Sequence, residues 1–217
     1  MFAGPKVYGA VGIAVDKTTS TEEKLGQLII NNGTFVGQYY AVVTWGGKTD
    51  YYCDIKINGG TFRTLDKENG VAIYNPAYNS TLTINGGDIC GGTGLEVRAG
   101  EVTINGGKIC GESVFTIVPN GNGATSTGCG VAVVQHTSKQ PINLTINGGL
   151  ISGNYAFYEA NPQKNEAEAI AQVQVSLNGG SYVPLYGDKE IIYSEDLTKF
   201  VNSKCLLAGT IKDSYKA

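Results

Sequence analysis

The sequence predicts an all-β fold, a parallel β-solenoid of about six to seven coils followed by a small C-terminal cap. Three observations support this prediction. A short phrase recurs six times along the 217 residues, apolar and polar residues alternate within each copy, and the intervals between copies vary. Such repeats are typical of folds in which each coil stacks on its neighbour, because one coil alone cannot bury its own interior.

The repeated phrase is clearest in LTINGGDICG and VTINGGKICG, which begin at Leu82 and Val102. The six copies occupy residues 28–37, 55–64, 82–91, 102–111, 144–153 and 175–184. Aligned on their shared asparagine, they are 27, 27, 20, 42 and 31 residues apart. The shortest interval is close to the minimum for a three-sided coil. The longer intervals indicate loops inserted at a corner, which leave the stacking intact.

Each copy alternates in the way that a strand requires. Leu82, Ile84 and Ile89 can face one side while the polar residues between them face the other. Asn-Gly-Gly between two short strands indicates a turn that needs positive φ, which glycine adopts readily. A β-hairpin is the alternative interpretation of such a turn. The unit recurs at coil-like intervals, however, so stacked coils explain the pattern better.

Stacking places equivalent residues of successive coils about 4.8 Å apart. The shared asparagines are therefore expected to form a hydrogen-bonded amide ladder at one corner. These residues are Asn31, Asn58, Asn85, Asn105, Asn147 and Asn178. Cys90 and Cys110 also occupy equivalent positions. Because side chains in register point the same way, we expect two stacked thiols there rather than a disulfide or a metal site.

A second recurrent stretch precedes the loop that leads into each new copy. GVAIYNP begins at Gly70 and GVAVVQH at Gly130, and both predict strands on another face of the coil. The pattern lapses after Pro184. Charged residues around Leu197 then predict a short amphipathic helix with Ser194 as its N-cap. We therefore divide the chain into a parallel β-helix over residues 1–184 and a capping segment over residues 185–217, which would protect the exposed end of the solenoid.

Composition and charge exclude several classes of partner. The net charge is −3 and the lysines and arginines are scattered, so we expect neither nucleic acid nor membrane as a partner. The N-terminal stretch lacks the continuous apolar run of a signal peptide. Five cysteines without a C-x-x-C motif indicate reduced thiols. These features indicate either synthesis without secretion or a fragment of a larger secreted protein.

The TINGG repeats, GLEVRAG from Gly94 and the ending YSEDLTKFVNSKCLLA from Tyr193 resemble parallel β-helix proteins of gut bacteria and their phages. The resemblance covers nearly the whole chain and implies a single-stranded, right-handed β-helix. Such modules occur in surface adhesins, carbohydrate-active proteins and virion fibres, so the resemblance implies several functions. Trimeric association is common in this group.

The acidic residues offer few combinations for glycoside cleavage, which needs two carboxylates at a defined separation. The candidates are Asp50, Asp54, Asp88, Glu96, Glu101, Glu112 and Glu159. Asp88 and Lys108 lie at equivalent positions and are expected to form an exposed pair. The only histidine, His136, lacks identifiable partners for a metal site or a catalytic triad. We therefore expect no catalytic residue, no metal and no cofactor.

Aromatic residues near one loop corner are the candidates for glycan binding, because a sugar ring can stack on an aromatic face. The short coil EVRAGE, residues 96–101, lies between longer-looped neighbours and is expected to leave a notch beside them. The candidate glycan-binding residues are Trp45, Tyr51, Tyr74, Tyr78, Glu96, Arg98, His136 and Tyr158. The alternative is that these tyrosines only close their own loops.

These features favour a non-catalytic structural and display protein, a phage virion component such as a capsid decoration or fibre, whose loops bind surface glycans. A carbohydrate-binding adhesin module of a bacterial surface protein is one alternative. A polysaccharide lyase or hydrolase of the tailspike type is another. The expected partners are cell-surface polysaccharide, other virion or surface proteins that dock on the N-terminal coil (residues 1–27), and further copies of the chain in a homotrimer. The expected location is a virion surface or a bacterial cell surface.

Overall fold

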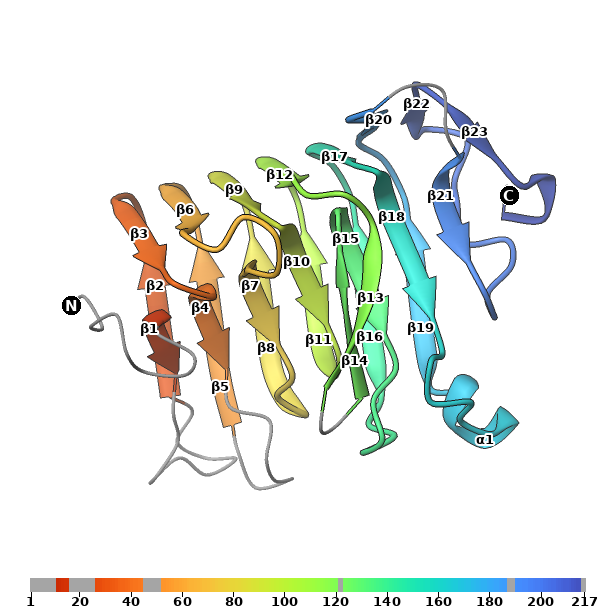
Figure 1. The fold of residues 1–217 in the computed structure, drawn as a ribbon, viewed down its shortest axis with the longest axis horizontal. Coiled ribbons are helices and arrows are strands. Elements are labelled where there is room, and N and C mark those ends of the chain that lie inside the picture. The colour runs from red at the N-terminus through yellow and green to blue at the C-terminus, as the bar shows by residue number, and fades with distance from the viewer. Residues whose placement is uncertain (1–10, 16–25, 45–51, 121–122, 187–189, 216–217) are drawn as a thin grey trace.

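A computed structural model describes residues 11–15, 26–44, 52–120, 123–186 and 190–215 of the chain. Strands predominate in this part and follow one another along a single long axis (Figure 1). Its helices are the four-residue α1 (Ala167–Ile170) and the three-residue 3₁₀ helix η1 (Asp213–Tyr215). Neither helix has the length or the apolar run that a membrane span requires. The predicted all-β class with stacked parallel strands is confirmed.

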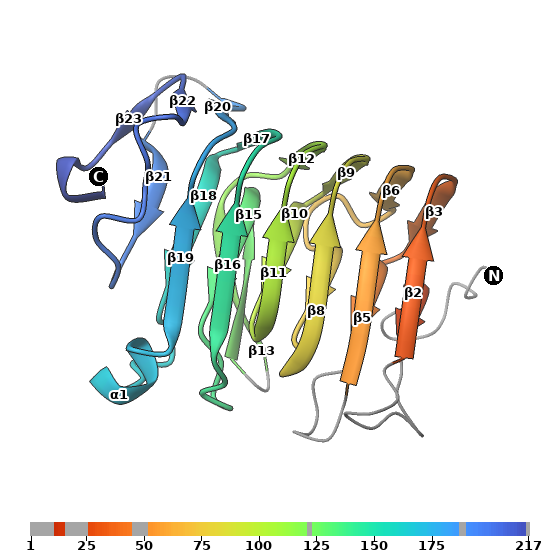
Figure 2. The same cartoon turned by 180° about the vertical axis from the view of Figure 1, so that it is seen from behind.

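Three parallel sheets make up the solenoid, and the chain passes from the six-stranded sheet to the seven-stranded and then to the eight-stranded sheet in each coil (Figures 1 and 2). The six-stranded sheet contains β2 (Gly26–Ile30), β5 (Tyr52–Ile57), β8 (Asn79–Ile84), β11 (Gly100–Ile104), β16 (Ile142–Ile146) and β19 (Val173–Leu177).

The seven-stranded sheet contains β3 (Thr34–Gly37), β6 (Thr61–Thr64), β9 (Asp88–Gly91), β12 (Lys108–Gly111), β17 (Leu150–Gly153), β20 (Ser181–Pro184) and β22 (Leu206–Leu207). The eight-stranded sheet contains β1 (Val11–Val15), β4 (Tyr40–Thr44), β7 (Val71–Asn75), β10 (Thr93–Val97), β15 (Cys129–Val134), β18 (Tyr155–Ala160), β21 (Glu190–Ser194) and β23 (Thr210–Ile211). A separate antiparallel hairpin is formed by β13 (Thr116–Asn120) and β14 (Gly123–Thr127).

The corner between the six-stranded and seven-stranded sheets holds a continuous ladder of the six shared asparagines. At each step the Nδ2 of the later asparagine donates to the Oδ1 of the earlier one, over 2.8–3.1 Å. The glycines that follow are required by the close approach of neighbouring coils. A Cβ on Gly86 would lie 2.9 Å from the carbonyl oxygen of Asn58, and Gly87 has a φ of 111°.

The core consists of apolar columns that run along the axis between the sheets. One column is Ile30, Ile57, Ile84, Ile104, Ile146 and Leu177, each at most 4% exposed. Each such side chain contributes about 1.5–3 kcal/mol through burial. Residues at this position are therefore apolar in every coil, because each forms part of the same column.

The C-terminal segment differs from the prediction, because the coil pattern continues beyond Pro184. Strand β21 pairs with β18, β22 with β20 and β23 with β21, all in parallel. Ser194 ends β21, and its Oγ accepts a hydrogen bond from the Leu197 N–H at 2.8 Å, as an N-cap would. No helix follows over residues 195–200, and Lys199 has a positive φ of 54°. Phe200 and Tyr215 close this end of the core.

The prediction of two free stacked thiols was wrong, because Cys90 and Cys110 form a disulfide. In-register pairing of β9 with β12 brings their Cα atoms to 4.7 Å, which lies within the range of disulfides. Register therefore brings the two sulfurs together instead of keeping them apart. Cys53, Cys129 and Cys205 are free and buried.

Candidate functional site

The longest interval between repeats contains the β13–β14 hairpin, which folds over the outer face of the eight-stranded sheet. Strand β14 contacts both β10 and β15. The two hairpin strands pair from Thr116 opposite Thr127 to Asn120 opposite Gly123. At the corresponding corners β9 joins β10 through Gly92 alone, and β17 joins β18 through Asn154 alone. The hairpin is thus an insertion at a corner that one residue can span, as it does in the coils on either side.

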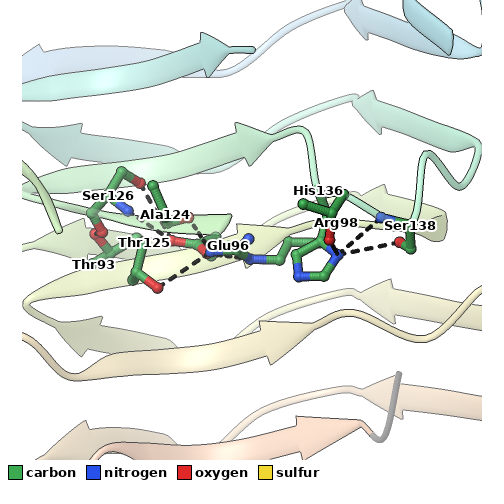
Figure 3. Close-up of polar contacts among 9 residues, drawn as sticks. Thr93, Glu96, Arg98, Ala124, Thr125, Ser126, His136 and Ser138 are labelled. Carbon is green, nitrogen blue, oxygen red and sulfur yellow. Dashed lines mark hydrogen bonds and ion pairs between the residues drawn. The ribbon is translucent and has the colours of Figure 1, made fainter. Parts of the chain in front are cut away.

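Beneath the hairpin lies a buried ion pair between Glu96 and Arg98, drawn in Figure 3. Both side chains point outward from β10 and its end, yet they are only 0% and 2% exposed. Arg98 Nε donates to Glu96 Oε1 at 2.7 Å. The other carboxylate oxygen accepts from the Ser126 N–H at 3.1 Å and the Ser126 Oγ at 3.3 Å. Burial raises the pKa of Glu96, and the charge of Arg98 opposes that shift.

Arg98 joins the hairpin to the neighbouring coil. Its Nη2 donates to the Ala124 carbonyl oxygen and, at 3.2 Å, to Thr125 Oγ1. Its guanidinium lies 5.5 Å from the centre of the Tyr74 ring, which stacks on Tyr40 at 5.1 Å. The Nη1 atom is buried and has no hydrogen-bond partner within the described part of the chain.

His136 follows β15 near the same guanidinium and is half-buried. Its Nδ1 accepts a hydrogen bond from the Ser138 N–H at 3.2 Å (Figure 3). Burial lowers the pKa of His136, and the positive charge of Arg98 lowers it further. Both effects favour the neutral imidazole, and its hydrogen bonds are to neighbouring residues in the same loop.

The notch predicted beside the EVRAGE coil is filled. The notch was predicted from loop lengths alone, but the hairpin, which follows a different strand, folds back over this position. Glu96 and Arg98 are consequently covered by protein and pair with each other. They hold the hairpin in place and are not available to a ligand.

Tyr158 is also covered, in an aromatic cluster further along the eight-stranded sheet. It is 5% exposed, stacks on Tyr193 at 5.2 Å and lies 4.8 Å from the ring of Phe115. Burial raises its pKa above the ordinary value. Phe115 precedes the hairpin, so this cluster fixes the base of the hairpin, while the ion pair fixes β14.

The remaining candidates are dispersed. Tyr78 is half-buried in the turn between β7 and β8. Trp45 and Tyr51 lie outside the described residues, as does most of the N-terminal coil proposed for docking. Tyr74, Glu96, Arg98 and His136 are thus the predicted residues that the fold brings together.

A hollow of about 450 Å³ lies on the other side of the hairpin, and the sequence analysis missed it. Its walls are residues 67–69 from the loop after β6, residues 112–114 after β12, Thr116 and Thr127 from the hairpin base, and Tyr186 after β20. This volume lies within the range of small-molecule sites. We refer to this feature as the corner hollow.

The corner hollow combines an aromatic ring with polar side chains. Tyr186 is 48% exposed, and its hydroxyl donates to the Glu112 carbonyl oxygen at 2.9 Å, which fixes the ring. Val114 is 71% exposed. Glu112 and Glu68 supply carboxylates, and Lys67 supplies a cation. The unequal lengths of the segments after β6, β12 and β20 are the feature of the sequence that could have indicated this hollow.

The other buried carboxylate, Glu159, has a structural role. It is 0% exposed and accepts from Ser194 Oγ at 2.6 Å and from the N–H groups of Glu195 and Asp196, each at 3.1 Å. Burial raises its pKa, and these hydrogen bonds oppose the shift. Glu159 thereby attaches the last coil to the one before it.

Comparison with known proteins finds no match: no family model, no curated protein and no solved structure is similar to this chain. The resemblance to parallel β-helix proteins of gut bacteria and phages therefore stays a prediction.

Proposed function

We propose that this chain is a non-catalytic display protein, a virion component such as a capsid decoration or fibre, that binds surface saccharides in the corner hollow. The observation that supports this proposal is the exposed ring of Tyr186, held by a hydrogen bond above a hollow with polar walls. A fixed aromatic face with hydrogen-bonding groups around it is suited to a sugar ring.

The rigidity of the surrounding structure supports the same proposal. The hairpin that forms one wall is attached by the Glu96–Arg98 pair at β14 and by the Phe115–Tyr158 cluster at its base. A wall that is already ordered loses little conformational entropy when a ligand binds. The buried charged groups are thus used to hold the binding surface in place.

A glycan array probed with the purified chain tests the proposal. We expect binding to a limited set of saccharides and its loss on Tyr186→Ala, because the stacking face is removed. Tyr78→Ala is the matched control, since Tyr78 is a half-buried tyrosine that does not line the corner hollow. Binding that is unchanged in Tyr186→Ala, or that depends equally on Tyr78, would contradict the placement of the site.

An adhesin module of a bacterial surface would bind saccharides in the same way. Neighbouring genes for capsid proteins or for anchor proteins would distinguish a virion component from an adhesin.

Cleavage of the bound saccharide is the second candidate function, because Glu68 and Glu112 both line the corner hollow. Two carboxylates across one site are the groups that glycoside hydrolysis uses. Assays for new reducing ends, with Glu68→Gln and Glu112→Gln as controls, distinguish cleavage from binding alone.

We also propose that the solenoid is a right-handed β-helix of six to seven coils. Parallel strand connections that cross over within one sheet are nearly always right-handed, because strands have a right-handed twist. An experimental structure of the chain tests both the hand and the number of coils.

A further inference from the structure

We propose that Cys90 and Cys110, when reduced, bind a zinc ion together with the carboxylates of Asp88 and Glu112. No metal was expected here from the sequence, and this inference does not depend on saccharide binding. It rests on four side chains that the register of β9 and β12 brings to one place on the outer face of the seven-stranded sheet.

The two cysteines supply the preferred ligands. They occupy paired positions of adjacent strands, with Cα atoms 4.7 Å apart, and are only 1% and 4% exposed. Strand register is set by the whole stack of coils, so the sulfurs stay neighbours after the disulfide is reduced. Two neighbouring thiolates bind soft or borderline cations such as Zn²⁺ in preference to Mg²⁺ or Ca²⁺.

Each of the two carboxylates lies beside one of the two sulfurs. Asp88 Oδ1 is 3.4 Å from Cys90 Sγ, and Glu112 Oε1 is 3.9 Å from Cys110 Sγ. With Zn–S near 2.3 Å and Zn–O near 2.0 Å, neighbouring sulfur and oxygen ligands are roughly 3.5 Å apart. The two sulfurs and a Glu112 oxygen lie within 4.8 Å of one another. Asp88 lies outside this group of three, and rotation of its side chain would complete the site.

Two basic side chains balance the charge of this cluster. Arg63 Nη2 pairs with Asp88 Oδ2, and Lys108 Nζ lies 3.8 Å from Asp88 Oδ1. Two thiolates and two carboxylates carry four negative charges, which Zn²⁺, Arg63 and Lys108 together offset. Arg63 also orients the Asp88 carboxylate from outside, as groups around zinc ligands commonly do. Because Glu112 lines the corner hollow, the ion can enter from solvent.

The disulfide and the zinc site are alternative states of the same two sulfurs. An external dithiol or phosphine cleaves the S–S bond, and the two sulfurs take up two electrons and two protons to become thiols. Zn²⁺ then displaces both protons when it binds the thiolates. The oxidised chain holds no thiolate at this place and should not bind.

Titration of the reduced chain with Co²⁺, after the reductant is removed without air, tests the proposal. We expect one Co²⁺ per chain, with thiolate-to-metal charge-transfer and tetrahedral d–d absorption bands, and full displacement of Co²⁺ by one equivalent of Zn²⁺. Loss of an outer group around zinc costs about 10–100-fold in affinity, so Glu112→Gln, which removes a ligand, should weaken binding by about tenfold or more. Cys53→Ser is the control, because Cys53 is a buried free cysteine on another sheet.

The oxidised wild type is a second control that needs no mutation and keeps the fold. The proposal is overturned if reduced wild type shows no charge-transfer band, if the band persists in the Cys90→Ser and Cys110→Ser double variant, or if oxidised chain binds as tightly as reduced chain. Zinc binding that is lost in the double variant but retained in Cys53→Ser supports it.

Discussion

Glu96 and Arg98 occupy outward positions on a β-sheet and are nevertheless as buried as the core. On a bare sheet both groups would be hydrated. The hairpin removes that water and supplies Ser126 and Ala124 as partners instead. A charge left alone in such a place costs several kcal/mol, so each member of the pair depends on the other.

Glu96→Gln should therefore destabilise the chain by about 3–5 kcal/mol, because it leaves the Arg98 charge buried without a counter-charge. Glu101→Gln is the matched control, since Glu101 is exposed on the next strand and its replacement should change stability by less than about 0.5 kcal/mol. Guanidinium unfolding of the three proteins measures both effects. Equal midpoints for Glu96→Gln and wild type would show that the pair does not hold the hairpin.

At the scale of elements, the repeats and the presence of insertions were predictable, but the fold of the longest insertion was not. The strands on either side of Asn85 follow from alternation and the Gly-Gly turn, which are local properties of the sequence. The hairpin was not predicted, because residues 112–128 match no repeat and their contacts with β10 lie far away in the chain. The helix expected after Ser194 failed for a similar reason: the local capping bond forms, but pairing of the last coil fixes the chain in another conformation.

The sequence did not predict where the candidate site lies. Tyr158 was proposed for glycan binding but is covered, and Tyr186, which lines the corner hollow, was not among the candidates. Register also explains the error at Cys90 and Cys110, where pairing brings two sulfurs within bonding distance. An insertion elsewhere in the chain can cover the outward face of a strand, and the local sequence pattern of that strand does not predict this.

Replacing residues 112–128 by one asparagine should leave the parallel sheets folded, because β17 and β18 are joined in the same way by Asn154. Coils contact mainly their neighbours, so loss of the insertion does not disturb the rest of the stack. The far-UV circular dichroism spectrum should keep its β-sheet form, while saccharide binding is lost with the hollow's wall. A chain that no longer folds would show instead that the hairpin is part of the core.

At the scale of the whole molecule, stability is a sum over contacts between successive coils. The asparagine ladder makes this visible, because an internal member has two amide partners and a terminal member has one. Asn105 donates to Asn85 and accepts from Asn147, both at 2.9 Å. Asn31 is the first member of the ladder and accepts from Asn58.

Each hydrogen bond contributes about 0.5–1.5 kcal/mol to stability. Asn105→Ala should therefore lower the free energy of unfolding by about 1–3 kcal/mol, and Asn31→Ala by about 0.5–1.5 kcal/mol. Thermal and guanidinium unfolding of both variants measure the difference. Equal losses at the two positions would contradict a ladder whose bonds contribute step by step.

Titration of an array-selected saccharide into the full chain, with new reducing ends measured in the same samples, tests the central claim most directly. We predict saturable binding that Tyr186→Ala removes. Neither wild type nor Glu112→Gln should produce new reducing ends. New reducing ends that disappear in Glu112→Gln would make the corner hollow an active site. A lack of saturable binding would leave the solenoid as a scaffold whose hollow has no saccharide ligand.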